Sequence, residues 1–136
     1  MNELKVLIID DEVVFSQNMA KLLNTRGYQT ETANSGEEGI RVLEKEAYDV
    51  VVLDLKMPGM NGIETLKKIN ELDIQLQVIL LTGHGCVDTA MIAIQLGAFD
   101  YLPKPCDVKE LSEMIDNSQK NKNKKLKKSK RLRMRL

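Results

Sequence analysis

The stretch VLIIDDEVVFSQ, residues 6–17, joins a short apolar run to three consecutive carboxylates. The β-branched run is typical of a buried strand, and Asp10, Asp11 and Glu12 follow it directly. Adjacent carboxylates repel one another, and burying one of them without a partner is costly. The stretch therefore predicts that these acids bind a cation, pair with a lysine or arginine, or stay in solvent.

Five short apolar segments like this one alternate with longer amphipathic segments. The predicted strands are residues 5–9, 28–32, 50–53, 78–81 and 100–102, and the predicted helices lie within residues 13–27, 35–45, 62–72, 87–96 and 108–117. This alternation indicates an α/β fold, a doubly wound parallel sheet with right-handed crossovers and helices on both faces. Five strands favour the strand order 2-1-3-4-5, which the sequence alone does not establish.

Short polar motifs mark several of the predicted helix ends. Gly27 stands where a C′ glycine would end the first helix. Ser35 with Glu38, and Asp107 with Glu110, have the three-residue spacing of N-terminal capping motifs. These motifs support the predicted division into strands and helices.

The length and composition of the chain limit its class. With 136 residues it can form one domain with a proper core and no disulfides. Cys86 and Cys106 have no metal-type spacing, and the first residues lack the basic and apolar regions of a signal peptide. No apolar run approaches the roughly 20 residues that cross a bilayer, so no transmembrane segment is predicted. We therefore expect a reduced, cytoplasmic protein.

The formal net charge of zero conceals two oppositely charged parts. Residues 120–136 hold ten of the 20 Lys+Arg residues and none of the 20 Asp+Glu residues, which leaves residues 1–119 with a net charge of −10. The sequence thus predicts an acidic domain, 1–119, followed by a basic, flexible tail, 120–136, that is too short to fold alone. Nucleic acid, an anionic membrane and the acidic domain itself remain open as partners of the tail.

Polar side chains follow other predicted strands as well as the first. Asp54 follows the third strand, Thr82 the fourth and Lys104 the fifth. Because the carboxyl ends of parallel strands meet at one edge of a sheet, these side chains should converge with the acidic run. Clustered carboxylates suit a hard cation, above all Mg²⁺, and Lys104 could pair with a phosphoryl group.

Taken singly, each of these residues has a simpler explanation. Asp10 and Asp11 could favour the positive end of a helix dipole, and Asp54 could begin a turn. Thr82 and Lys104 could be an ordinary strand-end residue and a solvated lysine. Their joint placement favours a functional site.

Four ordered motifs, IIDDE, VVLDLKMPGMNGIE, LLTGHG and FDYLPKP, resemble those of receiver domains of two-component response regulators. The resemblance covers residues 4 to about 118, almost the whole predicted domain. It implies a flavodoxin-like fold with strand order 2-1-3-4-5. It also implies a phosphoprotein of signal transduction, which is not a conventional enzyme but assists its own phosphoryl transfer and autodephosphorylation.

By this resemblance the acidic residues form a magnesium site. The side chains of Asp11 and Asp54 and the backbone carbonyl of Lys56 would ligate Mg²⁺. Asp10 would act on the ion largely through bound water.

The same resemblance assigns the phosphoryl chemistry. Asp54 would accept a phosphoryl group from the phosphohistidine of a sensor histidine kinase or a phosphotransfer protein. Thr82 would hydrogen-bond a phosphoryl oxygen, and Tyr101 would swing inward as Thr82 moves. Lys104 would pair with the phosphoryl group, because a cis peptide bond between Lys104 and Pro105 would turn its amine toward Asp54. The face built from the fourth helix, fifth strand and fifth helix would then change its affinity for a downstream protein, which the sequence does not identify.

Other functions stay open on the sequence alone. A DNA-binding transcriptional regulator would contact nucleic acid through the basic tail or an output domain beyond residue 136. A Mg²⁺-dependent phosphatase is disfavoured, because Leu55 and Lys56 follow Asp54 where such an enzyme would need a second aspartate. A homodimer is also open, and we expect His84, the lone histidine, to be an inert loop residue.

Overall fold

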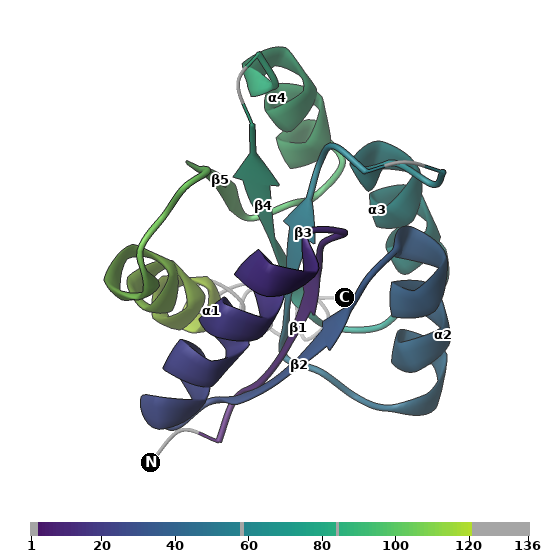
Figure 1. The fold of residues 1–136 in the computed structure, drawn as a ribbon. Helices are drawn as coiled ribbons and strands as arrows, with labels where there is room; N and C mark the ends of the chain where they lie inside the picture. The colour runs from purple at the N-terminus through teal and green to yellow at the C-terminus, as the bar shows by residue number, and fades with distance from the viewer. Residues whose placement is uncertain (1–2, 58, 84, 121–136) are drawn as a thin grey trace, which may run out of the picture.

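The computed structural model describes residues 3–57, 59–83 and 85–120 (Figure 1). Five parallel strands form one sheet in the order β2-β1-β3-β4-β5, which confirms the predicted fold class and strand order. The strands are β1 (Lys5–Ile9), β2 (Gln29–Ala33), β3 (Val50–Asp54), β4 (Gln77–Thr82) and β5 (Asp100–Pro103). The labelled helices are α1 (Val13–Thr25), α2 (Gly36–Lys45), α3 (Gly62–Glu71) and α4 (Val87–Gln95). A further helix, here called the C-terminal helix, comprises residues 108–120 of the described chain.

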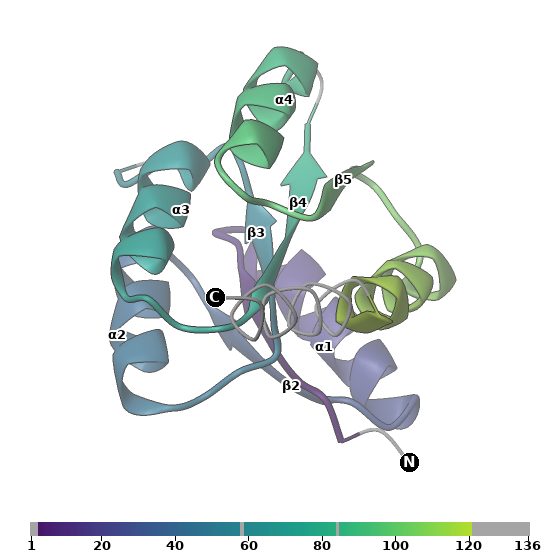
Figure 2. The same cartoon turned by 180° about the vertical axis from the view of Figure 1, so that it is seen from behind.

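Alternating side chains divide the core between the two faces of the sheet. In β1, Leu7 and Ile9 pack on one face, whereas Val6 and Ile8 pack on the other. This is the period of two that an extended strand imposes. Helices α2, α3 and α4 cover the first face, and α1 and the C-terminal helix cover the second, as the two opposite views in Figure 1 and Figure 2 show. All four side chains are fully buried, so the sheet is covered on both faces.

Within the described ranges, no helix combines the length and apolar character that crossing a membrane requires.

The helix ends follow the predicted motifs with one difference. Gly27 ends α1 with φ +97°, a left-handed conformation that glycine adopts without strain. Ser35 Oγ accepts a hydrogen bond from Glu38 N at 3.1 Å, as a capping box requires. The Glu38 carboxylate, however, accepts from Asn34 N and not from Ser35 N, so the reciprocal bond of the capping box is shifted by one residue.

The strands extend slightly beyond their predicted ends. β3 runs to Asp54, β4 to Thr82 and β5 to Pro103, one residue further than predicted in each case. Asp54 pairs with Leu81 of β4, and Thr82 pairs with Pro103 of β5. The backbones of Asp54 and Thr82 therefore belong to the sheet, and the sheet fixes the positions from which their side chains project.

The C-terminal helix is tied to the end of the sheet at which β3 and β4 begin. Gln77 Nε2 donates to Ser118 O at 3.2 Å, and Gln119 Nε2 donates to Asp49 O at 3.3 Å. The chain thus reaches residue 120 at the end of the sheet opposite the carboxyl ends of the strands. Residues 121–136, nearly all of the predicted basic tail, lie outside the described residues, so the division at residue 119 and the flexibility of the tail stay predictions.

Candidate functional site

The parallel register brings polar side chains together at the carboxyl edge of the sheet. Asp10 directly follows β1 and Asp54 is the last residue of β3, and the register of these strands places them side by side. On the other side of β3, Lys104 N donates to Thr82 O at 2.8 Å, which closes the end of β5 against β4. Four of the residues predicted for the site thus share one edge.

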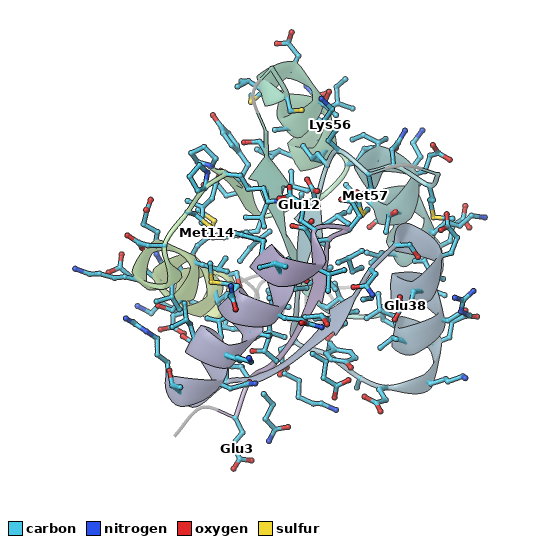
Figure 3. The ribbon with its side chains drawn as sticks, viewed as in Figure 1. Glu3, Glu12, Glu38, Lys56, Met57 and Met114 are labelled. Atoms are coloured by element: carbon cyan, nitrogen blue, oxygen red, sulfur yellow. The ribbon has the colours of Figure 1, made fainter. Side chains whose placement is uncertain are left out.

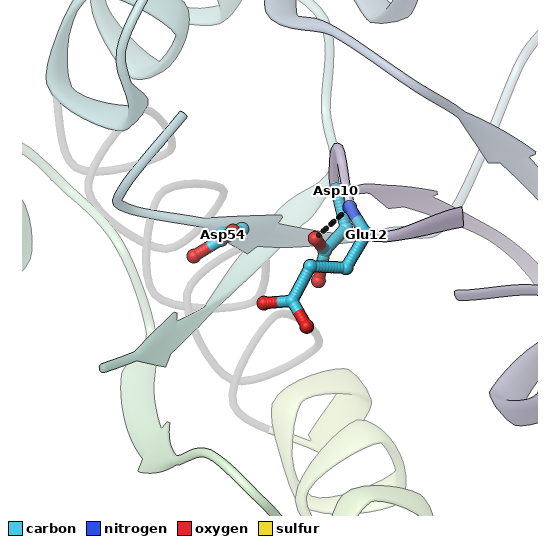
Figure 4. Close-up of side chains that lie close together, drawn as sticks. All are labelled: Asp10, Glu12 and Asp54. Carbon is cyan, nitrogen blue, oxygen red and sulfur yellow. Dashed lines mark hydrogen bonds between the residues drawn. The ribbon is translucent and has the colours of Figure 1, made fainter. Parts of the chain in front are cut away.

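Three carboxylates lie close together there, those of Asp10, Glu12 and Asp54 (Figure 4). One oxygen of each lies within 4.8 Å of the others. Asp10 is fully buried and Asp54 is 3% exposed, whereas the Glu12 side chain is 64% exposed. Glu12 N donates to Asp10 Oδ1 at 2.9 Å, which folds the loop after β1 over the edge. In Figure 3, Glu12 lies near the middle of the view, Lys56 lies above it and Glu3 lies at the bottom.

Lys104 places its ammonium group among these carboxylates. Nζ lies 2.7 Å from Glu12 Oε1 and 2.8 Å from Asp10 Oδ2. The distance from Nζ to Asp54 Oδ2 is 3.6 Å. Nζ also stands 4.6 Å from the centre of the Phe15 ring, a cation–π contact from α1. The ammonium group is therefore confined from several sides.

Burial and neighbouring charges shift the pKa values of Asp54 and Lys104. The pKa of Asp54 is raised from 3.8 to about 6, first because burial disfavours the charged form and second because Asp10 is negative. The hydrogen bond that Lys56 N donates to Asp54 Oδ1 at 3.2 Å and the charge of Lys104 act in the opposite direction. Burial lowers the pKa of Lys104, but its contacts with Asp10 and Glu12 outweigh this effect and raise the pKa overall. The lysine thus stays protonated within an acidic edge.

Thr82 and Tyr101 border a surface pocket on the β4–β5 side of this edge. The pocket has a volume of about 480 Å³ and is lined by Thr82, Gly83, Gly85, Val87, Tyr101, Pro103 and Lys104. Thr82 Oγ1 donates to Leu102 O at 3.3 Å, so its hydroxyl group is bonded to β5. Tyr101 is partly buried and packs against the core on the α2–α4 face. The Lys104–Pro105 bond is cis, which confirms what the resemblance implied.

The structure groups the acids differently from the resemblance. Asp11, which the resemblance makes a metal ligand, is exposed and does not belong to the group of three. Glu12, which the sequence placed in the acidic run without a role, does belong to it. Its position two residues after Asp10, the spacing of an aspartate-initiated turn, could have indicated this. Lys56 is exposed and its carbonyl role stays a prediction, while His84 lies outside the described residues.

The group of three carboxylates fits a hard divalent cation. Asp10 Oδ2 is buried, and its one partner among the described residues is Lys104 Nζ at 2.8 Å, so a metal could use its remaining lone pair. The potential ligands in the group are all oxygens, which Mg²⁺ prefers. The residues present are therefore consistent with the predicted ion.

The five-stranded parallel sheet with helices on both faces, with a buried aspartate, a lysine and a hydroxyl group at its carboxyl edge, belongs to the class of flavodoxin-like α/β domains. Within that class, the chain belongs to the response regulator receiver domain family, which matches residues 6–116. It is a receiver domain of the two-component response regulators, a family of phosphoacceptors and not of conventional enzymes.

Individual relatives support the same family. The chain is 37% identical over 115 residues to sporulation initiation phosphotransferase F of Bacillus subtilis (strain 168), covering 85% of this chain and 92% of that protein. It is 38% identical over 111 residues to the DNA-binding transcriptional regulator NtrC of Klebsiella pneumoniae, covering 82% of this chain and 24% of NtrC. The chain thus spans about a quarter of the length of such regulators.

A solved structure agrees with the fold. The crystal structure of a response regulator receiver domain protein from Clostridium thermocellum matches with a TM-score of 0.83 and 40% sequence identity. The match covers 88% of this chain and 97% of the crystallised one. The described sheet and helices are therefore those of a receiver domain.

Proposed function

We propose that this chain is a phosphorylation-controlled interaction module in which Asp54 accepts a phosphoryl group. The observation that carries the proposal is the position of the Asp54 carboxylate, nearly buried at the strand end with Lys104 Nζ 3.6 Å from it. A lysine at this distance can pair with the oxygens of a phosphoryl group on Asp54 without leaving the edge.

The donor would be the phosphohistidine of a sensor histidine kinase or a phosphotransfer protein. An Asp54 carboxylate oxygen attacks the phosphorus, and a P–O bond forms as the P–N bond breaks. The electron pair of the broken bond stays on the imidazole nitrogen, which takes a proton from water. Because the pKa of Asp54 is about 6, most of the carboxylate is ionised at neutral pH, as the attack requires.

The carboxylates at the edge would hold Mg²⁺ during this transfer. When bound, the ion supplies positive charge to the phosphoryl oxygens. Asp54 and Asp11 would be ligands together with the Lys56 carbonyl, and Asp10 would act through water. Asp10 Oδ2 pairs with Lys104 Nζ at 2.8 Å and with no other described residue, which leaves a lone pair for a bound water and supports this arrangement.

Phosphorylation would then act through Thr82 and Tyr101. To reach a phosphoryl oxygen, the Thr82 hydroxyl group must give up its hydrogen bond to Leu102 O. Tyr101 lines the same pocket as Thr82, so its ring is placed to respond to that movement. The responding face would be that of α4, β5 and the C-terminal helix. Three apolar side chains of α4, those of Val87, Met91 and Ile92, are each 51% exposed, which suits a protein-binding surface.

The downstream partner would be a protein, as the exposed apolar side chains of α4 favour. DNA binding remains the alternative, since similar proteins are named transcriptional regulators. It would require the basic tail or an additional domain to contact phosphates. Salt-sensitive binding of the chain to duplex DNA would distinguish this alternative.

Labelling with acetyl phosphate tests the proposal. In the presence of Mg²⁺ we expect intact-mass spectrometry to show the addition of one phosphoryl group, because Asp54 and Lys104 supply the acceptor and its counter-charge. A chelator should prevent the addition. A chain that stays unmodified at saturating donor and Mg²⁺ would rule out the proposed function.

Asp11→Ala is expected to weaken Mg²⁺ binding about tenfold or more, as loss of a carboxylate from a metal site does. The result is informative because Asp11 is exposed and lies outside the group of three carboxylates. Calorimetric titration of the two chains with Mg²⁺ measures the difference. Asp88→Ala, which removes an exposed carboxylate from α4, serves as the control. Equal affinity in Asp11→Ala and the parent would exclude Asp11 from the site.

A further inference from the structure

Glu12 makes the shortest of the three carboxylate contacts of Lys104. Glu12 Oε1 accepts a hydrogen bond from Nζ at 2.7 Å, whereas Asp54 Oδ2 lies 3.6 Å from the same nitrogen. A separation of 3.6 Å is longer than an N–H···O hydrogen bond. In the unphosphorylated chain the lysine is therefore bonded to Glu12 and to Asp10, whose Oδ2 lies 2.8 Å from Nζ, and not to Asp54.

Glu12 is fixed at its backbone, whereas its carboxylate is open to solvent. Its N–H is fixed by Asp10 Oδ1 at 2.9 Å, so the side chain always starts from the same point. Its side chain is 64% exposed, so the carboxylate can exchange the lysine for water at small cost. Asp10, by contrast, is fully buried and has no such access to solvent.

The position of Glu12 is unfavourable once Asp54 is modified. A Glu12 oxygen lies within 4.8 Å of an Asp54 oxygen. A phosphoryl group adds negative charge and three acceptor oxygens to Asp54, and these would face the Glu12 carboxylate. Like charges at such a distance disfavour the modified state. The same oxygens would also need the ammonium group that Glu12 holds together with Asp10.

We propose that Glu12 is a positioning residue that favours the unphosphorylated state by competing with the phosphoryl group for Lys104. Glu12 binds Lys104 while Asp54 is free, and it moves into solvent when Asp54 carries a phosphoryl group. Phe15, which stacks 4.6 Å from Nζ, keeps the lysine at the edge during the exchange. The inference rests on the proposed function of Asp54 and adds a residue that acts through the lysine.

Beryllofluoride, BeF₃⁻, tests this role because it imitates a phosphoryl group on an aspartate without a transfer reaction. Glu12→Gln keeps the shape of the side chain and removes its charge. At saturating Mg²⁺ we expect the Kd for BeF₃⁻ to fall about fivefold in Glu12→Gln, the order of effect of releasing one partly exposed ion pair. Damage to the fold would weaken binding, so tighter binding is specific to the proposed competition.

Glu64→Gln is the matched control, because Glu64 is an exposed acid in the first turn of α3. The inference holds if Glu12→Gln alone tightens BeF₃⁻ binding by about threefold or more, within the range of ion-pair contributions. A smaller change, weaker binding, or equal tightening in Glu64→Gln overturns it. A loss of Mg²⁺ affinity as large as that of Asp11→Ala also overturns it, since Glu12 would then be a metal ligand. If the parent chain neither binds BeF₃⁻ nor reacts with acetyl phosphate, the proposed function fails and the role of Glu12 fails with it.

Discussion

Asp54→Asn is expected to abolish the phosphoryl adduct that we expect acetyl phosphate to form on the parent chain. An amide cannot form an acyl phosphate, and the adjacent acids are poor substitutes for the lost carboxylate. Asp10 is fully buried, and Glu12 is bonded to Lys104. Intact-mass spectrometry of parent and variant, treated alike with Mg²⁺ and donor, gives the comparison.

The variant should keep its fold, because asparagine has nearly the same size as aspartate and the Asp54 backbone stays in the ladder with β4. Circular dichroism would verify this. Asp88→Asn, in an exposed position on α4, controls for the loss of one carboxylate and should still be labelled. An undiminished adduct on Asp54→Asn would show that another residue is the acceptor.

The fold was predictable because the strands carry an unusually simple pattern. Continuous apolar runs such as residues 50–53 and 78–81 occur where both faces of a sheet are covered, and both faces are covered here. The start of β2 was predicted at Tyr28, one residue before its observed start at Gln29, because Tyr28 still belongs to the end of α1. Tyr28 N donates to Leu23 O at 3.2 Å and so completes the end of α1, and the chain enters the sheet at Gln29.

The positions of Asp10 and Asp54 at the carboxyl edge of the sheet could be predicted, because each residue stands at the end of a recognisable strand. Asp10 and Asp54 were found from the rule that ligand sites of parallel sheets lie at the carboxyl edge. Glu12 was placed in the acidic run but given no role of its own, since that role depends on a turn and on the path of a distant lysine. The turn directs Glu12 toward the edge through its hydrogen bond to Asp10, and β5 delivers Lys104 from 92 residues away in the sequence. Neither relation leaves a periodic pattern in the sequence.

Asp54→Asn should also stabilise the metal-free, unphosphorylated chain at neutral pH. The pKa of Asp54 is about 6 in the folded chain against an ordinary value of 3.8, so the folded state binds the proton more tightly than the unfolded state. Stability should therefore fall as the pH rises from 3.8 to about 6, and the full cost of the buried charge is present above that range. A shift of this size corresponds to about 2–3 kcal/mol. Asparagine avoids that cost, because it carries no charge beside Asp10.

Urea unfolding of parent and Asp54→Asn in the presence of a chelator, over a series of pH values, measures this effect. The free energy of unfolding of the variant should exceed that of the parent at neutral pH, and the difference should disappear below pH 3.8, where Asp54 is protonated in both states. A difference that stays constant across the series would contradict the buried-charge explanation and indicate a packing effect. If Mg²⁺ binds the folded parent as proposed, it should reduce the difference at neutral pH, because it would offset the repulsion between Asp10 and Asp54.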